Sequence, residues 1–196
     1  MSEQSPGAGD VPEEWPVHEV EQVWKGGAPF SVRLDTLSAP SRPDQRFSRM
    51  VVEHPGAAVI LALDDHERVF VLQQYRHAAR MRFVELPAGL LDQEGEDPLV
   101  AAQRELREEA LLLARDWTHL LTTYSSPGFS SEKIHYYLAR DLSPAPDRGD
   151  FEPEHEEADM TTSWVPLHDL LDGVGTGRVS DGPTVTALLG YLQLVR

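Results

Sequence analysis

The sequence contains no cysteine, and its basic residues are few beside its acidic ones. The absence of cysteine excludes disulfides, thiolate catalysis and cysteine-ligated zinc, and it is compatible with a reducing compartment. The 196 residues carry 17 Lys and Arg against 33 Asp and Glu, so the formal net charge is −16. A field of this sign repels nucleic acid and anionic membranes, and we expect neither as a partner.

Long apolar runs and several catalytic signatures are absent as well. No stretch approaches the roughly 20 apolar residues that span a bilayer, and the first residues lack the basic and apolar regions of a signal peptide. We therefore expect a cytoplasmic protein. The sequence has no Gly-x-x-x-x-Gly-Lys phosphate loop and no Gly-x-Ser-x-Gly elbow, and its eight histidines show no metal-pair spacing. The corresponding enzyme classes are excluded.

The length and the 40% hydrophobic content predict one principal domain. Residues 1–14 are mostly Gly, Pro, Ser and acid, which predicts a disordered tail. Residues 15–50 contain short β-branched and aromatic runs, which predict antiparallel N-terminal strands. Residues 51–196 are expected to form the main domain. The strands expected in the early part are 18–24, 30–37 and 47–53.

The main domain opens on a predicted hairpin, with a nearly all-apolar arm over 57–63, a polar turn and a second arm over 68–75. Continuous apolarity in the first arm predicts a central strand covered on both faces. Further strands are expected at 120–124 and 133–139, around a Ser-Ser-Pro-Gly turn, and at 162–165, with helices near 167–173 and 183–195. Together these elements predict an α/β fold in which helices cover both faces of a mixed sheet.

The strongest helix signal begins at Asp97-Pro98, an N-cap residue followed by proline, and predicts a helix over 98–112. Within its run RELREE, Glu105 and Glu109 share one face because they lie four residues apart, and Glu108 lies beside them. Like charges so placed repel, and a divalent ion such as Mg²⁺ or Mn²⁺ would compensate them. Taken alone, the pattern also fits a solvated acidic face of an amphipathic helix.

The residues around this helix resemble the Nudix box, in which Gly, five residues, Glu and seven residues precede Arg-Glu-aliphatic-x-Glu-Glu-x-Gly-aliphatic. Here Gly89 is followed by six residues, Glu96, seven residues and the run from Arg104 to Leu112. The extra loop residue leaves open whether Glu94 or Glu96 is the first acid of the box. Leu111 replaces the box glycine, and because leucine adopts positive φ less readily, we expect a different exit from the helix.

This resemblance implies a Nudix-type α/β/α sandwich with a mixed central sheet, an additional N-terminal antiparallel sheet, and hydrolysis of a nucleoside diphosphate linked to another group. It implies two or more Mg²⁺ ions, or Mn²⁺, bound by Glu105, Glu109 and the Ala88 carbonyl. Glu108 is implied as a further ligand or a neighbour of the ligands, and Arg104 as the residue that orients the carboxylates.

Segments beyond the box are similar to bacterial ADP-ribose pyrophosphatases: VRLDT, VEHPGAAVI, QQYRH, ELPAG, HEEADM and a proline fifteen residues after Leu112. The similarity implies that ADP-ribose is split into AMP and ribose 5-phosphate, and that residues 15–50 form a homodimer. It implies a catalytic glutamate, Glu157, in a loop of 141–159 whose eight acids against one arginine also fit a solvated linker. The implied substrate-binding residues are Arg76, Glu85, Arg82, Pro127 and Gly128.

For Arg76 and Glu85, both a functional and a purely structural interpretation remain open. Arg76 could donate to phosphate, stack on adenine or lie at the surface, and Glu85 could bind ribose hydroxyls or lie at a sheet edge. Other functions also stay open: hydrolysis of another nucleoside diphosphate sugar or a dinucleotide, or a non-catalytic Nudix domain that senses a ligand. Retention of all three acids, Glu105, Glu108 and Glu109, favours an enzyme.

Overall fold

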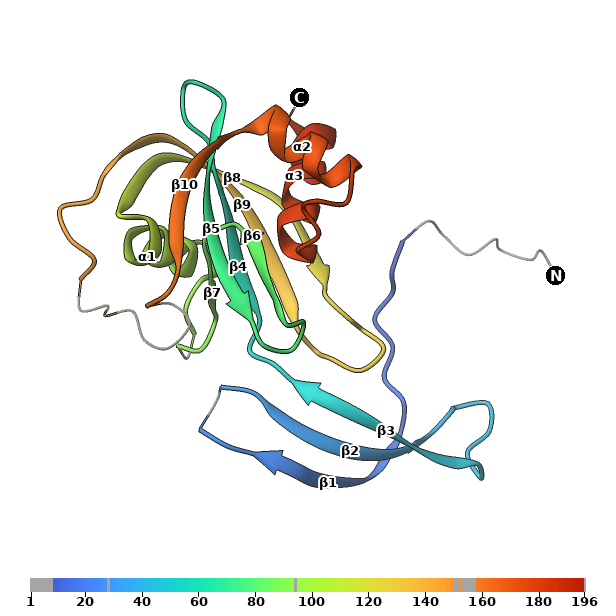
Figure 1. Ribbon diagram of the computed structural model, residues 1–196. Coiled ribbons are helices and arrows are strands. Elements are labelled where there is room, and N and C mark those ends of the chain that lie inside the picture. Colours follow the sequence, from blue (N-terminus) through green and yellow to red (C-terminus); the bar gives the residue numbers. More distant parts are fainter. Residues whose placement is uncertain (1–8, 28, 94, 150–151, 153–157, 196) are drawn as a thin grey trace. The chain divides into compact units, whose positions relative to one another are not determined.

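The computed structural model describes residues 9–27, 29–93, 95–149, 152 and 158–195. The chain divides into two compact units, Met1–Val52 and Glu53–Arg196 (Figure 1). Among the described residues, no helix combines the length and the apolarity that a membrane crossing requires.

The first unit is a three-stranded sheet in the order β1-β2-β3. Its strands are β1 (Val17–Lys25), β2 (Ser31–Ser38) and β3 (Arg46–Glu53). β1 and β2 run antiparallel, with Val20 opposite Asp35, so the predicted antiparallel N-terminal strands are confirmed. Every residue of β1 is exposed, and its apolar side chains include Val20 (59% exposed) and Trp24 (44%).

The second unit contains two sheets. The four-stranded sheet has the order β7-β4-β9-β8, and the three-stranded sheet has the order β10-β5-β6. β4 and β9 pair in parallel, while the other strand pairs of these two sheets are antiparallel. The strands are β4 (Ala57–Ala62), β5 (Arg68–Arg76), β6 (Met81–Glu85), β7 (Ala88–Leu90), β8 (Leu112–Tyr124), β9 (Lys133–Pro144) and β10 (Thr161–Pro166).

The predicted hairpin between 57–63 and 68–75 is wrong beyond its turn. Asp64 N–H donates to the Arg68 carbonyl at 3.0 Å, and Leu63 and Val69 form an isolated bridge, but β4 and β5 then enter different sheets. Both strands are mostly buried, so the backbone N–H and C=O groups along both edges of each strand need hydrogen-bond partners from neighbouring strands. β4 finds them in β7 and β9, and β5 finds them in β10 and β6.

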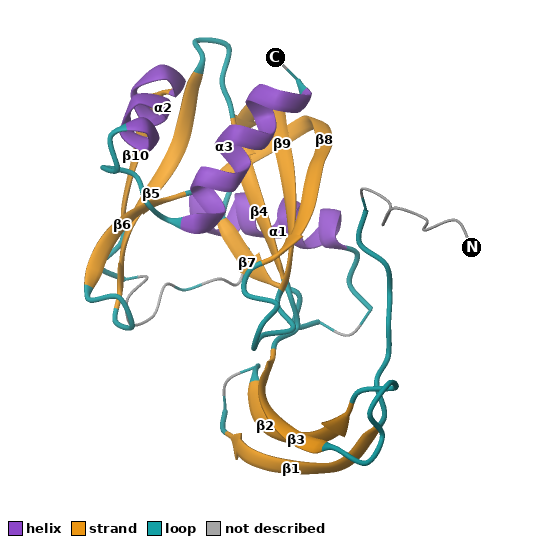
Figure 2. Ribbon diagram, turned by 90° about the vertical axis from the view of Figure 1, so that its right-hand side faces the viewer, coloured by secondary structure: helices purple, strands orange, loops and turns teal. Residues whose placement is uncertain are grey.

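The helices α1 (Pro98–Ala110), α2 (Leu167–Gly175) and α3 (Gly182–Leu194) complete the second unit. Successive residues of a strand point to opposite faces of its sheet. Ile60 of β4 packs in a core with Leu106 of α1, whereas Leu61 packs in a second core with Leu188 of α3. Figures 1 and 2 accordingly show α1 and α3 on opposite sides of the four-stranded sheet. The predicted α/β/α sandwich and its doubly covered central strand are confirmed.

The ends of α1 decide how the acidic run is presented. Asp97 caps the helix, accepting from Leu99 N–H at 2.8 Å, as the sequence predicted. The helix ends at Ala110, and Leu111 takes the left-handed conformation (φ 54°, ψ 38°). The expected departure from a glycine-like exit is therefore wrong. β8 begins directly at Leu112, and the Leu111 carbonyl accepts from Ala145 N–H at 2.8 Å, so tertiary pairing imposes a conformation that costs leucine roughly 1–2 kcal/mol.

Candidate active site

A pocket of about 670 Å³ lies in the second unit, a volume in the range that small-molecule sites occupy. One part of its lining is polar and comes from α1, and another part comes from all three residues of β7. β5 contributes Gln74 and Arg76. The lining residues of α1 are Arg104, Glu105, Glu108 and Glu109.

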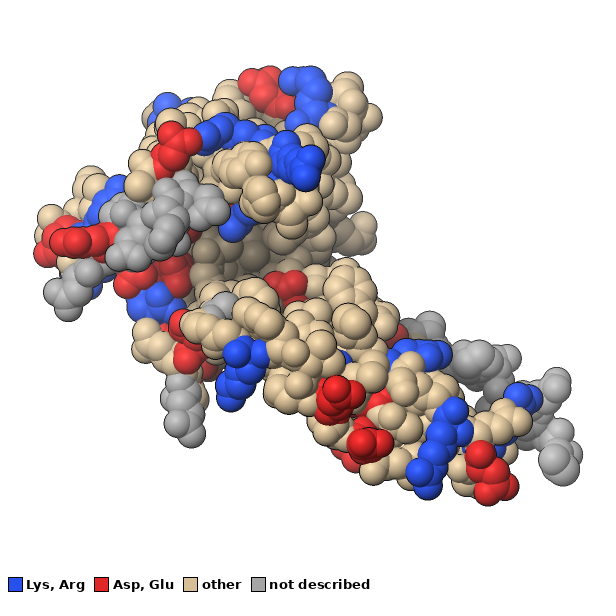
Figure 3. Space-filling view, turned by 60° about the horizontal axis from the view of Figure 1, so that its bottom comes forward, with Lys and Arg blue, Asp and Glu red and all other residues tan. Residues whose placement is uncertain are grey.

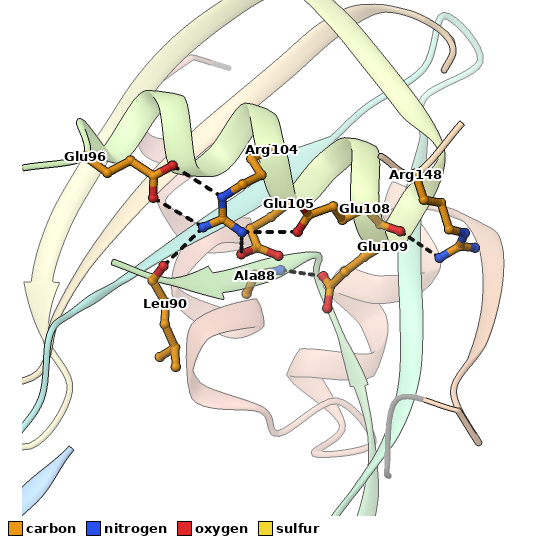
Figure 4. Close-up of polar contacts among 8 residues, drawn as sticks. All are labelled: Ala88, Leu90, Glu96, Arg104, Glu105, Glu108, Glu109 and Arg148. Carbon is orange, nitrogen blue, oxygen red and sulfur yellow. Dashed lines mark hydrogen bonds and ion pairs between the residues drawn. The ribbon is translucent and has the colours of Figure 1, made fainter. Parts of the chain in front are cut away.

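Arg104 is the centre of a cluster of carboxylates (Figure 4). Its Nη1 donates to Glu105 Oε1 at 2.5 Å and to Glu108 Oε2 at 3.1 Å. Its Nε and Nη2 donate to the two oxygens of Glu96, each at 3.3 Å. Burial lowers the pKa of Arg104, but the hydrogen bond to Glu96 and the charge of Glu105 outweigh it, and the pKa stands above its ordinary value. Arg104 is therefore a permanent cation that holds three acids in place.

Glu96, one of the two candidates for the first acid of the box, contacts Arg104. Its side chain is only 8% exposed and pairs with Arg104, eight positions later in the sequence. The other candidate, Glu94, lies outside the described residues. Glu96 therefore belongs to the Arg104 cluster.

Glu105 and Glu109 are buried, at 8% and 7% exposure, and both line the pocket. Glu109 Oε2 accepts from Ala88 N–H at 2.9 Å. A Cβ atom at Gly89 would lie 1.8 Å from Glu105 Oε1. Only glycine therefore lets the β7 backbone approach this carboxylate so closely, and α1 and β7 form one acidic wall of the pocket.

This donor set suits a hard divalent ion such as Mg²⁺ or Mn²⁺, which prefers carboxylate oxygen. Within the described part of the chain, no three His, Asp or Glu side chains converge as a preformed metal site. Arg104 holds Glu105 and Glu108, and the Ala88 N–H, rather than its carbonyl, contacts Glu109. Glu105, Glu108 and Glu109 fit such an ion if their side chains rotate from Arg104 and Ala88 toward it.

Arg76 and Glu85, both predicted to bind substrate, bind each other. Arg76 Nε donates to Glu85 Oε1 at 2.9 Å, and its Nη2 donates to Oε2 at 2.6 Å. This hydrogen bonding raises the pKa of Arg76. The Arg76 side chain is 52% exposed and lines the pocket, whereas that of Glu85 is 7% exposed. Glu85 thus orients a guanidinium whose remaining surface faces the pocket.

The other predicted residues lie elsewhere. Arg82 pairs with the Asp159 carboxylate and donates to the carbonyls of Gln73 and Asp159, each at 3.1 Å. Pro127 and Gly128 are exposed in the turn between β8 and β9. None of these three is among the described residues that line the pocket. Glu157 lies outside the described residues.

Among the described lining residues, sequence reasoning missed five polar ones: His54, Gln74, Asp92, Glu132 and Asp181. Gln74 is 6% exposed, and His54 Nε2 lies 3.7 Å from Glu132 Oε1. Asp181-Gly182-Pro183 carried a usable signal, since an aspartate shortly before a proline also begins α1.

Charged surface groups often occur as mixed pairs, such as Arg107 with Asp147, and Figure 3 shows basic and acidic side chains beside one another on one face.

Comparison with known proteins defines the class of this fold and site. The model of the NUDIX domain matches residues 52–187, which include the acidic run of α1, the Gly89 approach and the sheets that carry them. The chain therefore belongs to the NUDIX domain family.

Individual relatives are similar over most of the chain. An ADP-ribose pyrophosphatase of Mycobacterium tuberculosis (strain ATCC 25618 / H37Rv) is 41% identical over 163 residues, which cover 83% of this chain and 76% of the relative. An ADP-ribose pyrophosphatase of Bacillus subtilis (strain 168) is 36% identical over 174 residues, covering 89% and 90%. A crystal structure of an ADP compounds hydrolase shares the fold, with a TM-score of 0.75 at 24% identity over 94% of this chain and 96% of the other.

Proposed function

We propose that this chain is a metal-dependent hydrolase that cleaves the diphosphate of ADP-ribose to AMP and ribose 5-phosphate. The observation that carries the proposal is the pocket itself, in which the acids of α1 and the guanidinium of Arg76 line one cavity. Two relatives of 41% and 36% identity bear the name ADP-ribose pyrophosphatase. The volume of about 670 Å³ suits a ligand of this size.

Glu105 and Glu109 would hold the divalent ions, two or more Mg²⁺ or Mn²⁺, together with Glu108 and the Ala88 carbonyl. When bound, such ions neutralise a diphosphate and lower the pKa of a coordinated water. Arg104 keeps the carboxylates oriented, because one guanidinium contacts Glu96, Glu105 and Glu108.

Arg76 would contact the phosphates or the adenine of the substrate. Its fork toward Glu85 fixes the guanidinium plane, while half of the side chain stays accessible in the pocket. Glu85 would act through Arg76 rather than through a contact with ribose, because its carboxylate is buried and already binds the guanidinium. Arg82, Pro127 and Gly128 would contribute only if the substrate extends beyond the pocket lining.

Glu157 would activate the attacking water. The described parts of its loop are fixed on both sides: Arg107 pairs with Asp147, Arg148 Nη1 donates to the Glu108 carbonyl at 2.7 Å, and Arg82 pairs with Asp159. The Arg148 bond attaches the first side of the loop to α1 itself. Glu157 lies between these attachments in the sequence, two residues before Asp159, and this placement supports a role close to the acids of α1.

Residues 15–50 would form a homodimer, and the protein would act in the cytoplasm. The exposed apolar residues of β1, among them Val20, Val23 and Trp24, supply a surface that a second copy could cover. Light scattering at micromolar concentration tests this directly, and a monomeric mass with full activity would contradict it.

The substrate is tested by incubating the protein and Mg²⁺ with a panel of ADP-ribose, other ADP-sugars, FAD, NADH and diadenosine polyphosphates, and separating the products. We expect AMP and ribose 5-phosphate from ADP-ribose, at the highest kcat/KM of the panel. Faster cleavage of another member would assign that substrate instead. No cleavage of any member would favour a non-catalytic domain.

A further inference from the structure

Thr184 connects the C-terminal helix to the bend that carries the site. It is fully buried, at 0% exposure, in the first turn of α3. Its hydroxyl donates to Asp181 Oδ2 at 2.8 Å and accepts from Leu86 N–H at 3.2 Å. Asp181 Oδ2 also accepts from Thr184 N–H at 2.9 Å and so caps the helix. Because the aspartate accepts the hydroxyl proton, the hydroxyl oxygen is directed at Leu86.

Leu86 lies in the short bend from Glu85 to Ala88, where the chain passes from one sheet of the second unit to the other. Both ends of the bend serve the site: Glu85 holds Arg76, and Ala88 N–H holds Glu109. Of the two residues between them, Pro87 has no N–H group. Leu86 is 3% exposed, so its N–H needs a partner inside the protein, and Thr184 supplies it.

We propose that Thr184 is a positioning residue: its hydroxyl sets the bend at which Ala88 contacts Glu109 and Glu85 contacts Arg76. The inference rests on the proposed function, since it concerns the same acids and the same guanidinium. It adds a residue of α3 that lies outside the box and, unlike Asp181, outside the pocket lining of the described residues. Small displacements of such supporting groups are costly, because a misplacement of about 1 Å can lower a rate by ~10²-fold.

Three variants separate this role from a merely structural one. Thr184→Val keeps the shape and removes both hydroxyl bonds, while Thr184→Ser keeps the hydroxyl. Thr186→Val is the matched control, because Thr186 lies on the same helix and its hydroxyl donates to the Gly182 carbonyl at 2.8 Å. Thr184→Ala replaces the valine variant if circular dichroism shows that the latter does not fold.

Two readouts are needed: kcat and KM for ADP-ribose with Mg²⁺, and the Mn²⁺ dissociation constant from electron paramagnetic resonance without substrate. We expect Thr184→Val to lower kcat and to weaken Mn²⁺ binding, each by about 10-fold, with Thr184→Ser and Thr186→Val near wild type. A folded Thr184→Val protein with wild-type kcat and Mn²⁺ affinity would overturn the inference. If wild-type protein leaves ADP-ribose intact, the proposed function fails, and the Mn²⁺ titration still decides the role of Thr184.

Discussion

Replacing Gly89 by alanine adds one methyl group at the closest approach between β7 and α1. The new Cβ would lie 1.8 Å from Glu105 Oε1 and 1.9 Å from its Cδ. Since non-bonded carbon contacts are normally about 3.5–4 Å, the carboxylate must move by roughly 1.5 Å or more. The backbone of Gly89 is outside the left-handed region, so alanine fits it without dihedral strain. The whole clash falls on a side chain that can rotate.

The expected result is a protein that folds and has lost its activity. Moving the Glu105 carboxylate away from Arg104 breaks a charge-assisted hydrogen bond and should cost about 2 kcal/mol of stability. A displacement above 1 Å at a metal-binding acid should lower kcat/KM by ~10²-fold or more. Thermal unfolding by circular dichroism and steady-state hydrolysis of ADP-ribose measure the two effects separately.

Gly175→Ala is the matched control, because no heavy atom lies within 4 Å of the Cβ it would gain, at the end of α2. It should leave both the melting temperature and the rate near their wild-type values. Wild-type activity in Gly89→Ala would refute the reasoning, since Glu105 could then not be needed where the structure places it. A loss of several kcal/mol of stability would show that the backbone, not the side chain, absorbs the methyl group.

Three further predictions address the acids and the helix end. Glu109→Gln preserves volume and removes one charge, so it should keep the fold and lower the Mg²⁺-dependent rate by at least about 100-fold; a near wild-type rate would exclude Glu109 as a ligand. Glu157→Gln should lower kcat by ~10²–10⁴-fold with metal affinity little changed, while Glu154→Gln is nearly silent; equal, small effects would make the loop a linker. Leu111→Gly should be more stable than Leu111→Ala by about 1 kcal/mol in denaturant unfolding, because only glycine relieves the left-handed strain; the reverse order would contradict the observed cap.

Local signals predicted the parts of the fold that depend on neighbours in sequence. Asp97-Pro98 located the start of α1, and the continuous apolar run at 57–63 identified the doubly covered strand. The hairpin failed because strand pairing is decided by partners far along the chain, such as β9, which pairs with β4. β7 was missed because a strand of three residues carries too little pattern to detect.

The candidate site likewise combines features that depend on sequence neighbours, which could be predicted, with contacts between distant residues, which could not. Helical periodicity was enough to place Glu105 and Glu109 on one face, where both now line the pocket. Pairings between elements could not be read from periodicity: Arg76 with Glu85 depends on the register of β5 against β6, and Arg82 with Asp159 joins residues 77 positions apart. Leu111 shows that tertiary structure can impose on a residue a backbone conformation against its intrinsic preference.

The complete burial of β4 has a consequence for how the chain folds during synthesis. β4 is made before α3, which covers one of its faces, and before β9, which pairs with one of its edges 77 residues later in the register Ala57 to Ile134. Pairing over such separations is slow, and an apolar strand without charge is prone to self-association while it waits. Asp64 and Asp65 lie shortly after this strand and Pro55 shortly before it, and charged residues and proline at such positions discourage aggregation. The most buried strand of the second unit is thus the one most in need of protection until β9 and α3 have been made.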